Sequence, residues 1–271
     1  MKTVIVPTDF SDASTNAVLF AADLAMDVNA SLEIYHAVPD HVVLIDDLEF
    51  EEEYAETEQA MQQLEELQEK VRSYSQHRLS IDVKLKYGNI DRVLEESCKE
   101  YTPFAVVMSA TAKNAIERFL FGSETLTVSH KLQVPVLLIP HNAEFMGFKK
   151  VAIATDFNEV YDTMPLHSLT HWIDAFKPTL EIVYVNEDSK FSKENVSGAV
   201  TLQTHFEKYN PAIRYIQSGN IADGISNYLK ESRADLLIIV PKKHAFFHKS
   251  LSREFIIHPT IPTMIIAGHH K

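Results

Sequence analysis

A stretch near the N-terminus recurs in the middle of the chain, and this duplication constrains the fold more than any other feature. Residues 4–11 read VIVPTDFS, and residues 151–158 read VAIATDFN. In both copies a short apolar run of the kind that forms a buried strand meets an acidic turn, and a Ser or Asn follows that can cap a helix. The sequence therefore predicts one strand–turn–helix unit that is used twice.

Three further short matches follow in the same order along the two halves. They pair residues 32–34 with 180–182, residues 88–90 with 219–221, and residues 134–135 with 261–262. Matches that keep their order over long gaps indicate two copies of one domain rather than a solenoid of short repeats. We place these domains at residues 1–142 and 149–271, with a linker between them.

Apolar runs and helical stripes alternate within each half. In the first half we predict strands at residues 4–7, 32–38, 81–87, 105–108 and 134–139, and helices from residue 11, at 46–76, at 91–101 and after Gly122-Ser123. This alternation is typical of parallel βαβ units, so the predicted fold class is α/β, with a five-stranded parallel sheet in each tandem domain. The last strand of each domain contains a proline, which is tolerated at a sheet edge.

Length, cysteine content and hydropathy narrow the class of protein further. A chain of 271 residues is comfortable for two domains. Its one cysteine, Cys98, excludes an intrachain disulfide and is expected to be a small hydrophobe on the inner face of a helix. No apolar run approaches the ~18 residues of a membrane span, and the N-terminus leads directly into a strand. We therefore expect a soluble, cytoplasmic protein that does not enter membranes.

Negative charge is concentrated in the first half. Residues 1–146 hold 11 Lys and Arg against 25 Asp and Glu, whereas residues 147–271 hold 14 against 13. An acidic surface repels phosphate backbones, so we expect no nucleic-acid partner. Eleven of these 25 acids lie on the predicted helix 46–76, which also carries an apolar stripe. That helix either packs its stripe on its own domain or presents it to a protein partner.

Two features could carry binding chemistry. Asp9 lies just past the carboxyl end of a strand, where open α/β sheets place ligand contacts. Its carboxylate could accept hydrogen bonds from a nucleoside, or it could cap the next helix. Gly122-Ser123 opens a helix, whose N–H groups could seat a phosphate, although a simple N-cap would give the same pattern.

The chain resembles the tandem universal stress proteins over nearly its whole length. The resemblance rests on residues 7–11 (PTDFS), residues 36–38 (HAV), Gly122-Ser123 and residues 134–137 (VPVL). ATP-binding members of that family have Gly-x-x-Gly, nine further residues, and then Gly-Ser or Gly-Thr. Here the spacing is kept, but Ser109 and Ala112 replace the first two glycines. If both positions need a positive φ, the loss in affinity is on the order of ten- to a thousandfold, and restoring both glycines should tighten ATP binding.

The resemblance implies a fold of the adenine-nucleotide hydrolase-like, Rossmann-like type and a set of contacts for ATP in the first domain. Asp9 and the backbone at Ala37 would hold the ribose and adenine. The phosphates would be lined by Ser109, Ala112, Gly122, Ser123 and Thr125. The resemblance also implies that the last strands of the two domains pair to form an internal pseudo-dimer, to which a further homodimer could be added.

The second domain departs further from the ATP-binding pattern. Lys249-Ser250 replaces Gly122-Ser123, and the loop at residues 241–248 lacks glycine and is four residues shorter. We expect no ATP site there. The loop is basic and could meet an anion or the acidic half, or it could simply be a solvated surface. His244 and His248 have the i, i+4 spacing of metal ligands, but no third ligand is evident, so no metal is expected.

The function that these features favour is a non-catalytic stress-response module that senses nucleotide or binds a protein partner. One alternative is a scaffold that binds no nucleotide, and another is a weak ATP-hydrolysing enzyme. The sequence contains no Gly-x-x-x-x-Gly-Lys P-loop and no Gly-x-Gly-x-x-Gly. Because no Mg²⁺ carboxylate, general base or arginine finger can be identified either, the enzyme ranks last.

Overall fold

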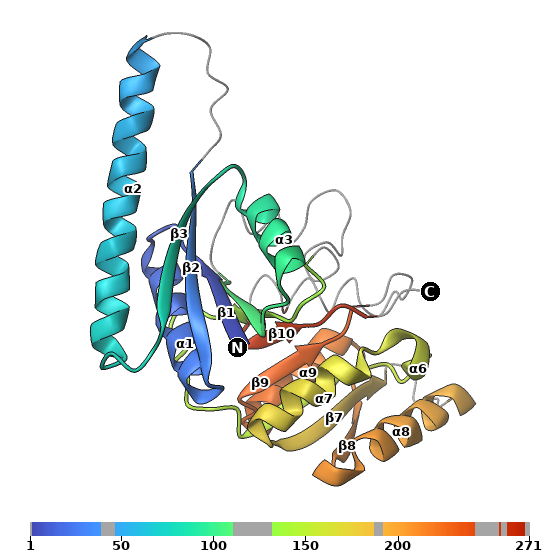
Figure 1. The fold of residues 1–271 in the computed structure, drawn as a ribbon. Coiled ribbons are helices and arrows are strands. Elements are labelled where there is room, and N and C mark those ends of the chain that lie inside the picture. The colour runs from blue at the N-terminus through green and yellow to red at the C-terminus, as the bar shows by residue number, and fades with distance from the viewer. Residues whose placement is uncertain are drawn as a thin grey trace.

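A single mixed sheet runs through the whole molecule, with helices on both faces (Figure 1). The computed structural model describes residues 2–38, 47–110, 132–186, 192–241, 255 and 259–268, and the side chains of residues 47–54 are not among the described groups. The strand order is β3-β2-β1-β4-β5-β10-β9-β6-β7-β8. Read from either end, the two halves have the same order, and the predicted α/β class with a mostly parallel sheet is confirmed.

The helices and strands follow the order predicted from the repeated motifs. The first half contains β1 Lys2–Pro7, α1 Asp12–Asp27, β2 Ala30–Val38, α2 Asp47–Tyr74, β3 Ile81–Tyr87, α3 Ile90–Glu100, β4 Ala105–Ser109 and β5 Val136–Ile139. The second half contains β6 Lys150–Ala154, α6 Val160–Thr163, α7 Leu166–Phe176, β7 Thr179–Asn186, α8 Lys193–His205, a 3-10 turn at Glu207–Tyr209, β8 Ala212–Gln217, α9 Ile221–Ser232, β9 Leu236–Ile239 and β10 Thr263–Ile265. The helix predicted after Gly122-Ser123 lies outside the described residues.

The central strands are apolar on both faces because helices cover both. Val4 and Val6 of β1 join the cluster beneath α1, while Ile5 faces the cluster beneath α3. Successive side chains of a strand point to opposite faces, so an uninterrupted apolar run indicates a strand that is buried on both faces of the sheet. Cys98 of α3 is buried in the second cluster, and burial raises the pKa of its thiol to about 12. It is an inert packing residue, as predicted.

The two halves meet through an antiparallel pair of strands. β5 pairs with β10, with Leu137 opposite Met264, whereas the other described strand pairs are parallel. The prolines of the two motifs, Pro135 and Pro262, each lie one residue before these strands. The carbonyls of Pro135 and Pro262 accept hydrogen bonds from Val106 and Leu237, at 2.9 and 3.0 Å. The prolines predicted to lie within these strands thus lie just before them, and each strand is the edge of its own half, as predicted, but interior in the complete sheet.

An aromatic cluster lies under this junction and draws on both halves. The ring of Trp172 in α7 stacks on Phe104 at 4.8 Å, and its Nε1 donates to the Phe104 carbonyl at 3.2 Å. Phe148 of the linker packs edge-on against Phe176 at 5.1 Å. Trp172 is only 2% exposed. Because these rings belong to one apolar cluster that spans both halves, the halves share a core.

Helix α2 supports the packing interpretation over its C-terminal part. Leu64, Leu67 and Val71 are buried against β2 and β3. Tyr74 donates to Asp23 of α1 at 2.7 Å, and that hydrogen bond with the carboxylate raises the pKa of Tyr74 to about 12. Figure 1 shows that the N-terminal part of α2 extends beyond the strands that it packs on. A partner for that part remains a prediction. No helix in the described ranges has the length and hydropathy that crossing a membrane would need.

Each half carries a glutamate on its second strand, partly buried at Glu33 and buried at Glu181. Glu33 accepts hydrogen bonds from Lys84 at 2.8 Å and from Tyr35 at 2.9 Å. Glu181 pairs with Arg214 of β8 at 2.5 Å and with Lys150 at 3.1 Å. Burial raises the pKa of Glu181, but hydrogen bonds from Tyr228, Arg214 and Lys150 outweigh it, so the pKa lies below its usual value.

We predict that Trp172→Ala lowers the free energy of unfolding by about 3–5 kcal/mol, because it empties a buried aromatic site. Val196→Ala, at an exposed position, should change it by less than about 0.5 kcal/mol. Trp172 is the single tryptophan, so its fluorescence reports on the shared core. In the unmodified chain, urea unfolding followed by fluorescence and by far-UV circular dichroism should coincide. Two separate midpoints would show that the halves unfold independently.

We also predict that Glu181→Gln lowers stability at pH 7 by about 1–3 kcal/mol. A depressed folded-state pKa contributes stability above the unfolded value and loses it as the pH falls. The difference between variant and unmodified protein should therefore shrink below about pH 4.5, as urea titrations at several pH values would reveal. Glu33→Gln is the matched variant and should show a smaller effect, since its side chain is 15% rather than 4% exposed. A difference that does not change with pH would contradict this account.

Candidate functional site

Three of the predicted site residues lie along the carboxyl edge of the first half. Asp9 is the second residue after β1, Ser109 ends β4, and Ala37 is the second-last residue of β2. β1 and β4 are neighbours whose connections leave in opposite directions, and such a switch point is where open α/β sheets bind ligands. The other predicted contacts, Ala112, Gly122, Ser123 and Thr125, lie outside the described residues.

Asp9 belongs to a tightly bonded turn. Its Oδ1 accepts from the backbone N–H of Ser11 at 3.1 Å and from the Ser11 hydroxyl at 2.6 Å. The Phe10 N–H donates to the hydroxyl of Thr8 at 3.1 Å, and Phe10 has a φ of 62°. Burial raises the pKa of Asp9, but hydrogen bonds from Ser11 and Ser14 outweigh it and hold the pKa below its usual value. Asp9 is therefore an exposed, ionised carboxylate at neutral pH.

The second copy of the motif makes the same turn. Phe157 has a φ of 58°, and its N–H donates to the Thr155 hydroxyl at 3.2 Å. The N–H of Asn158 donates to Oδ1 of Asp156 at 3.0 Å. In both copies the Thr and Asp side chains accept successive backbone N–H groups, and these bonds hold the phenylalanine in a left-handed conformation. The turn alone explains why Thr-Asp-Phe is repeated, so the repeat by itself does not make Asp9 a ligand contact.

The two turns differ in what covers them. Asp9 is exposed, whereas Asp156 is only 4% exposed. In the second half, α8 lies on the turn, and Asn195 Nδ2 donates to the Asp156 carbonyl at 3.0 Å. A Cβ on Gly198 would sit 1.9 Å from the Phe157 carbonyl oxygen. Helix and turn are thus in direct backbone contact, which leaves no room for a ligand over Asp156.

The other two positions of the second half have also changed. The strand registers align Ser109 with Val240 and Ala37 with Val185. Val240 and Val185 are 1% and 2% exposed, and Gly224 of α9 lies close against Val185. The hydroxyl of the first half is thus replaced by an apolar side chain, and the half-buried alanine by a buried valine. The shortened loop expected in the second half lies outside the described residues.

Ser109 does not have the strained backbone that we considered at the sequence level. It ends a regular strand, is 2% exposed, and is not among the residues with positive φ. A serine in place of glycine therefore costs no backbone strain at this position. The expectation that glycine at both positions would tighten ATP binding loses its basis at Ser109, and Ala112 lies outside the described residues.

His36 is a site residue whose role the sequence did not reveal. Its Nδ1 donates to the Thr8 carbonyl at 2.8 Å, and its ring packs on Phe10 at 4.4 Å between centroids. It thus fixes the turn that carries Asp9 and places a half-buried flat surface beside it. Tyr184 stacks on Phe157 at 5.2 Å in the second half. The sequence did contain one signal for this role, because His36 and Tyr184 are ring-bearing residues at equivalent positions of β2 and β7.

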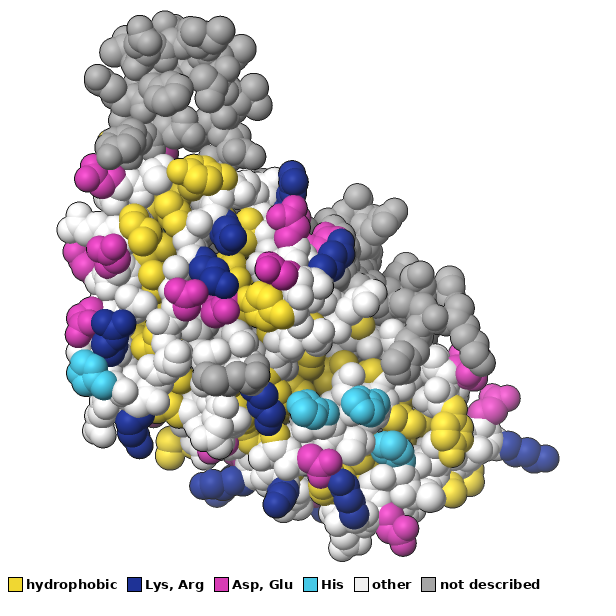
Figure 2. All heavy atoms as spheres, in the orientation of Figure 1, with side chains coloured by type: hydrophobic (Ala, Val, Ile, Leu, Met, Phe, Trp, Pro, Cys, Tyr) yellow, Lys and Arg dark blue, Asp and Glu magenta, His cyan; other side chains and the backbone are white. Residues whose placement is uncertain are grey.

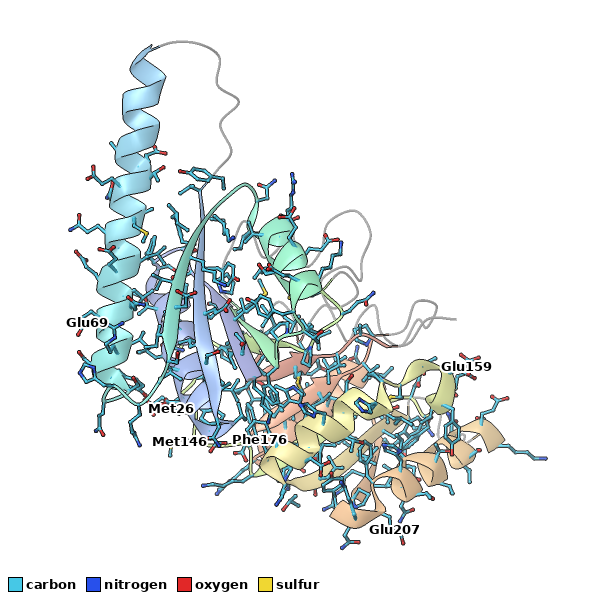
Figure 3. The ribbon with its side chains drawn as sticks, in the orientation of Figure 1. Met26, Glu69, Met146, Glu159, Phe176 and Glu207 are labelled. Carbon is cyan, nitrogen blue, oxygen red and sulfur yellow. The ribbon has the colours of Figure 1, made fainter. Side chains whose placement is uncertain are left out.

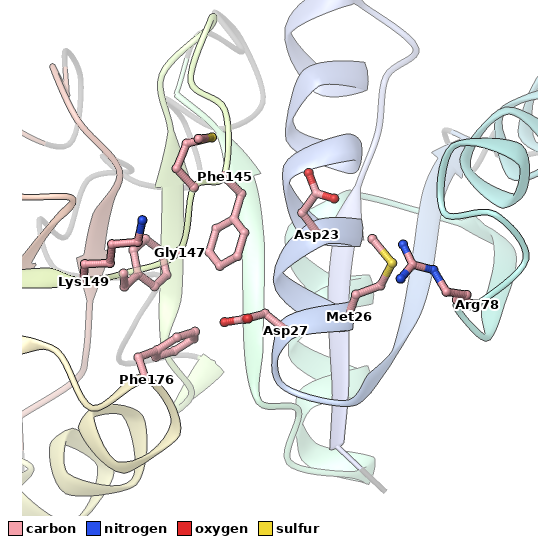
Figure 4. A pocket seen from close by; sticks show the side chains of 10 residues that line it. Asp23, Met26, Asp27, Arg78, Phe145, Gly147, Lys149 and Phe176 are labelled. Atoms are coloured by element: carbon pink, nitrogen blue, oxygen red, sulfur yellow. The ribbon is translucent and has the colours of Figure 1, made fainter.

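A cavity of about 630 Å³ lies at the opposite end of the strands (Figure 4). Figure 3 shows Met26, Met146 and Phe176 close together there, below α1. Its charged lining combines Asp23 and Asp27 with Arg78 and Lys149. These charges balance, so the cavity offers no positive field for phosphate, and it is far from Asp9 along the sheet. Within the described ranges, no group of three or more His, Cys, Asp or Glu is placed to hold a metal ion. His244 and His248 lie outside those ranges.

Comparisons with known proteins agree with this geometry. The model of the universal stress protein family matches residues 1–140. A universal stress protein from Archaeoglobus fulgidus has a similar structure, with a TM-score of 0.67, 16% identity and 98% of each chain covered. A protein of unknown function from Pseudomonas aeruginosa matches with a TM-score of 0.54 and 12% identity, over 99% of this chain and 93% of that one. At these identities the likeness shows the fold alone.

A universal stress protein solved in complex with cAMP matches 52% of this chain and 98% of its own, with 22% identity and a TM-score of 0.37. A TM-score this low does not bear on the ligand of the present chain. No curated protein matches the sequence.

We predict that Gly198→Ala destabilises the protein by about 1–3 kcal/mol, because the new methyl group would collide with the Phe157 carbonyl. Glycine to alanine inside a helix normally stabilises by roughly 1 kcal/mol, so the expected sign is reversed. Gly219→Ala is the control, since a Cβ there meets nothing within 4 Å. Urea unfolding would compare the two. A stabilised Gly198→Ala variant would show that α8 does not lie on the turn.

Proposed function

Because the chain belongs to the universal stress protein family, we propose that it is a non-catalytic stress-response module that senses an adenine nucleotide or binds a protein partner. We further propose that residues 149–271 are a second copy of the domain at residues 1–142. The repeated turn and the matching strand order of the two halves support this tandem arrangement. The β5–β10 pair supports an internal pseudo-dimer.

We place the nucleotide site in the first half only. The observation that carries this proposal is the contrast between an exposed Asp9 and an Asp156 that is 4% exposed under α8. An ionised carboxylate at the switch point can accept hydrogen bonds from both hydroxyls of a ribose. The backbone at Ala37 and the His36 ring lie on the same edge and suit a flat, hydrogen-bonding base. Contacts of Ala112, Gly122, Ser123 and Thr125 to the phosphates remain predictions.

Two alternative functions remain, and each can be distinguished from the proposed one by an experiment. A scaffold without nucleotide is favoured by Ala112 in place of the second glycine, since Ser109 costs no backbone strain. A weak ATP-hydrolysing enzyme would need a metal-binding carboxylate and a base near the phosphates, neither of which the sequence identifies. Binding without turnover supports the proposed function, no binding supports the scaffold, and release of ADP supports the enzyme.

We predict that the full-length protein binds ATP and that Asp9→Asn weakens this binding about ten- to a hundredfold. The estimate follows from a charged hydrogen bond worth about 1.5–3 kcal/mol. Asparagine keeps an acceptor for the Ser11 N–H, so the turn should survive. Asp156→Asn is the matched variant and should leave the affinity unchanged. Isothermal titration calorimetry with ATP measures all three, and chromatography of the mixture detects ADP.

The full-length chain is the right material, because the aromatic cluster of Trp172 and Phe104 crosses between the halves. Weakening by Asp156→Asn with no effect of Asp9→Asn would place the site in the second half and refute the proposal. A heat signal that neither variant alters would exclude both turns as the binding site.

A further inference from the structure

The strand β8 forms one end of the ten-stranded sheet. Among the described residues it pairs with β7 only, over Ala212–Gln217. An edge strand presents unpaired N–H and C=O groups, and soluble proteins usually protect it with charges, prolines or a covering element. The one charged side chain of β8, Arg214, is held against Glu181 on a face of the sheet. It therefore does not guard the edge.

The opposite edge, β3, is protected in three ways. Its exposed residues include the charged Asp82 and Lys86, whereas Lys84 is held against Glu33 on a face of the sheet, as Arg214 is against Glu181. Helix α2 packs on it, and Gln68 Nε2 donates to the Ile81 carbonyl at 3.0 Å. It also belongs to the acidic half, so two copies of this edge would repel each other. Of the two ends of the sheet, β8 is the one suited to association.

Exposed apolar side chains lie on β8 and on helix α8, which precedes it in the chain. Tyr215 is 53% exposed, and it faces the same side of the sheet as α8, with its ring 6.2 Å from Phe157. Val196 and Val200 of α8 are 56% and 57% exposed. Figure 2 shows hydrophobic side chains at the end of the molecule where α6 and α8 lie, and Figure 3 marks the turn into β8 at Glu207. An open strand with apolar neighbours is typical of an interface.

We propose that β8 pairs antiparallel with β8 of a second copy of this chain, with Tyr215 on the two-fold axis. This register places the two Tyr215 rings opposite each other and Arg214 opposite Ile216, a pairing that favours aromatic contact and separates like charges. Centring on Arg214 would instead set two guanidinium groups face to face. Residues 147–271 hold 14 Lys and Arg against 13 Asp and Glu, so their charge hardly opposes association.

The chain already uses this kind of contact internally. β5 and β10 join the two halves edge to edge as antiparallel strands. The proposed β8 contact repeats that geometry between chains, and its two-fold symmetry makes it closed and self-complementary. The two acidic halves would lie at the far ends of the dimer, since β3 and β8 are at opposite ends of the sheet.

Light scattering coupled to size-exclusion chromatography tests the proposal on the full-length protein. A dimer has twice the mass of the 30.8 kDa chain. Tyr215→Lys should shift the protein to monomer, because it sets two ammonium groups opposite each other. Tyr87→Lys on β3 is the matched control, as Tyr87 is 55% exposed on the other edge, and it should leave the dimer intact. A monomeric unmodified protein, or a dimer broken only by Tyr87→Lys, would overturn the proposal.

Cysteine cross-linking tests the register and does not depend on breaking the dimer. The only native cysteine, Cys98, is buried, so an introduced thiol reacts alone. Side chains directly opposite in an antiparallel pair have Cβ atoms about 4.5–5.5 Å apart, close to the span of a disulfide. Mild oxidation of Tyr215→Cys should give a disulfide-linked dimer, and Tyr87→Cys should not. A dimer in which Tyr215→Cys fails to cross-link would show that another surface is used.

Discussion

The antiparallel junction of β5 with β10 determines the rest of the architecture. It turns two parallel sheets into one and brings Phe104 of the first half against Trp172 of the second. Buried aromatic rings contribute several kcal/mol each, so a junction of four or more strongly opposes separation of the halves. Because β5 and β10 are antiparallel, the junction also fixes the directions in which the carboxyl edges of the two halves point. Asp9 and Asp156 therefore lie at the ends of strands in one continuous sheet, and the differences between them arise locally.

Because of those local differences, the same turn is exposed in the first half and buried in the second. Thr and Asp side chains satisfy the N–H groups behind a left-handed phenylalanine in both copies. In the second half, Asn195 and Gly198 let α8 lie directly on the turn, and the carboxylate is buried with it. Burial converts the second turn into part of the core. The first turn keeps its carboxylate ionised and exposed, which is a condition for binding a polar ligand.

Much of this could be predicted from residues that act locally. The apolar runs, the repeated Thr-Asp-Phe and the stripe of Leu64, Leu67 and Val71 each report on the few residues around them, and their strands, turns and helix follow. The cover over Asp156 depends on which helix reaches which loop, and a lone Gly198 in the sequence does not reveal its partner. The backbone angle of Ser109 likewise depends on the strand ending there rather than one residue earlier. The role of His36 could not be predicted from its motif, because it depends on a hydrogen bond to the Thr8 carbonyl in another strand–turn unit.

A shared core also links the candidate site to the half that lacks one. A ligand that binds only the folded state stabilises it by RT ln(1 + [L]/Kd), which is about 2.7 kcal/mol at a hundredfold excess over Kd. If the halves were independent, nucleotide at Asp9 would protect residues 1–142 alone. Because Trp172 of the second half packs on Phe104, unfolding either half exposes the same cluster. Nucleotide at the first turn would then stabilise the second half, together with the β8 edge at its far end, although no ligand touches either.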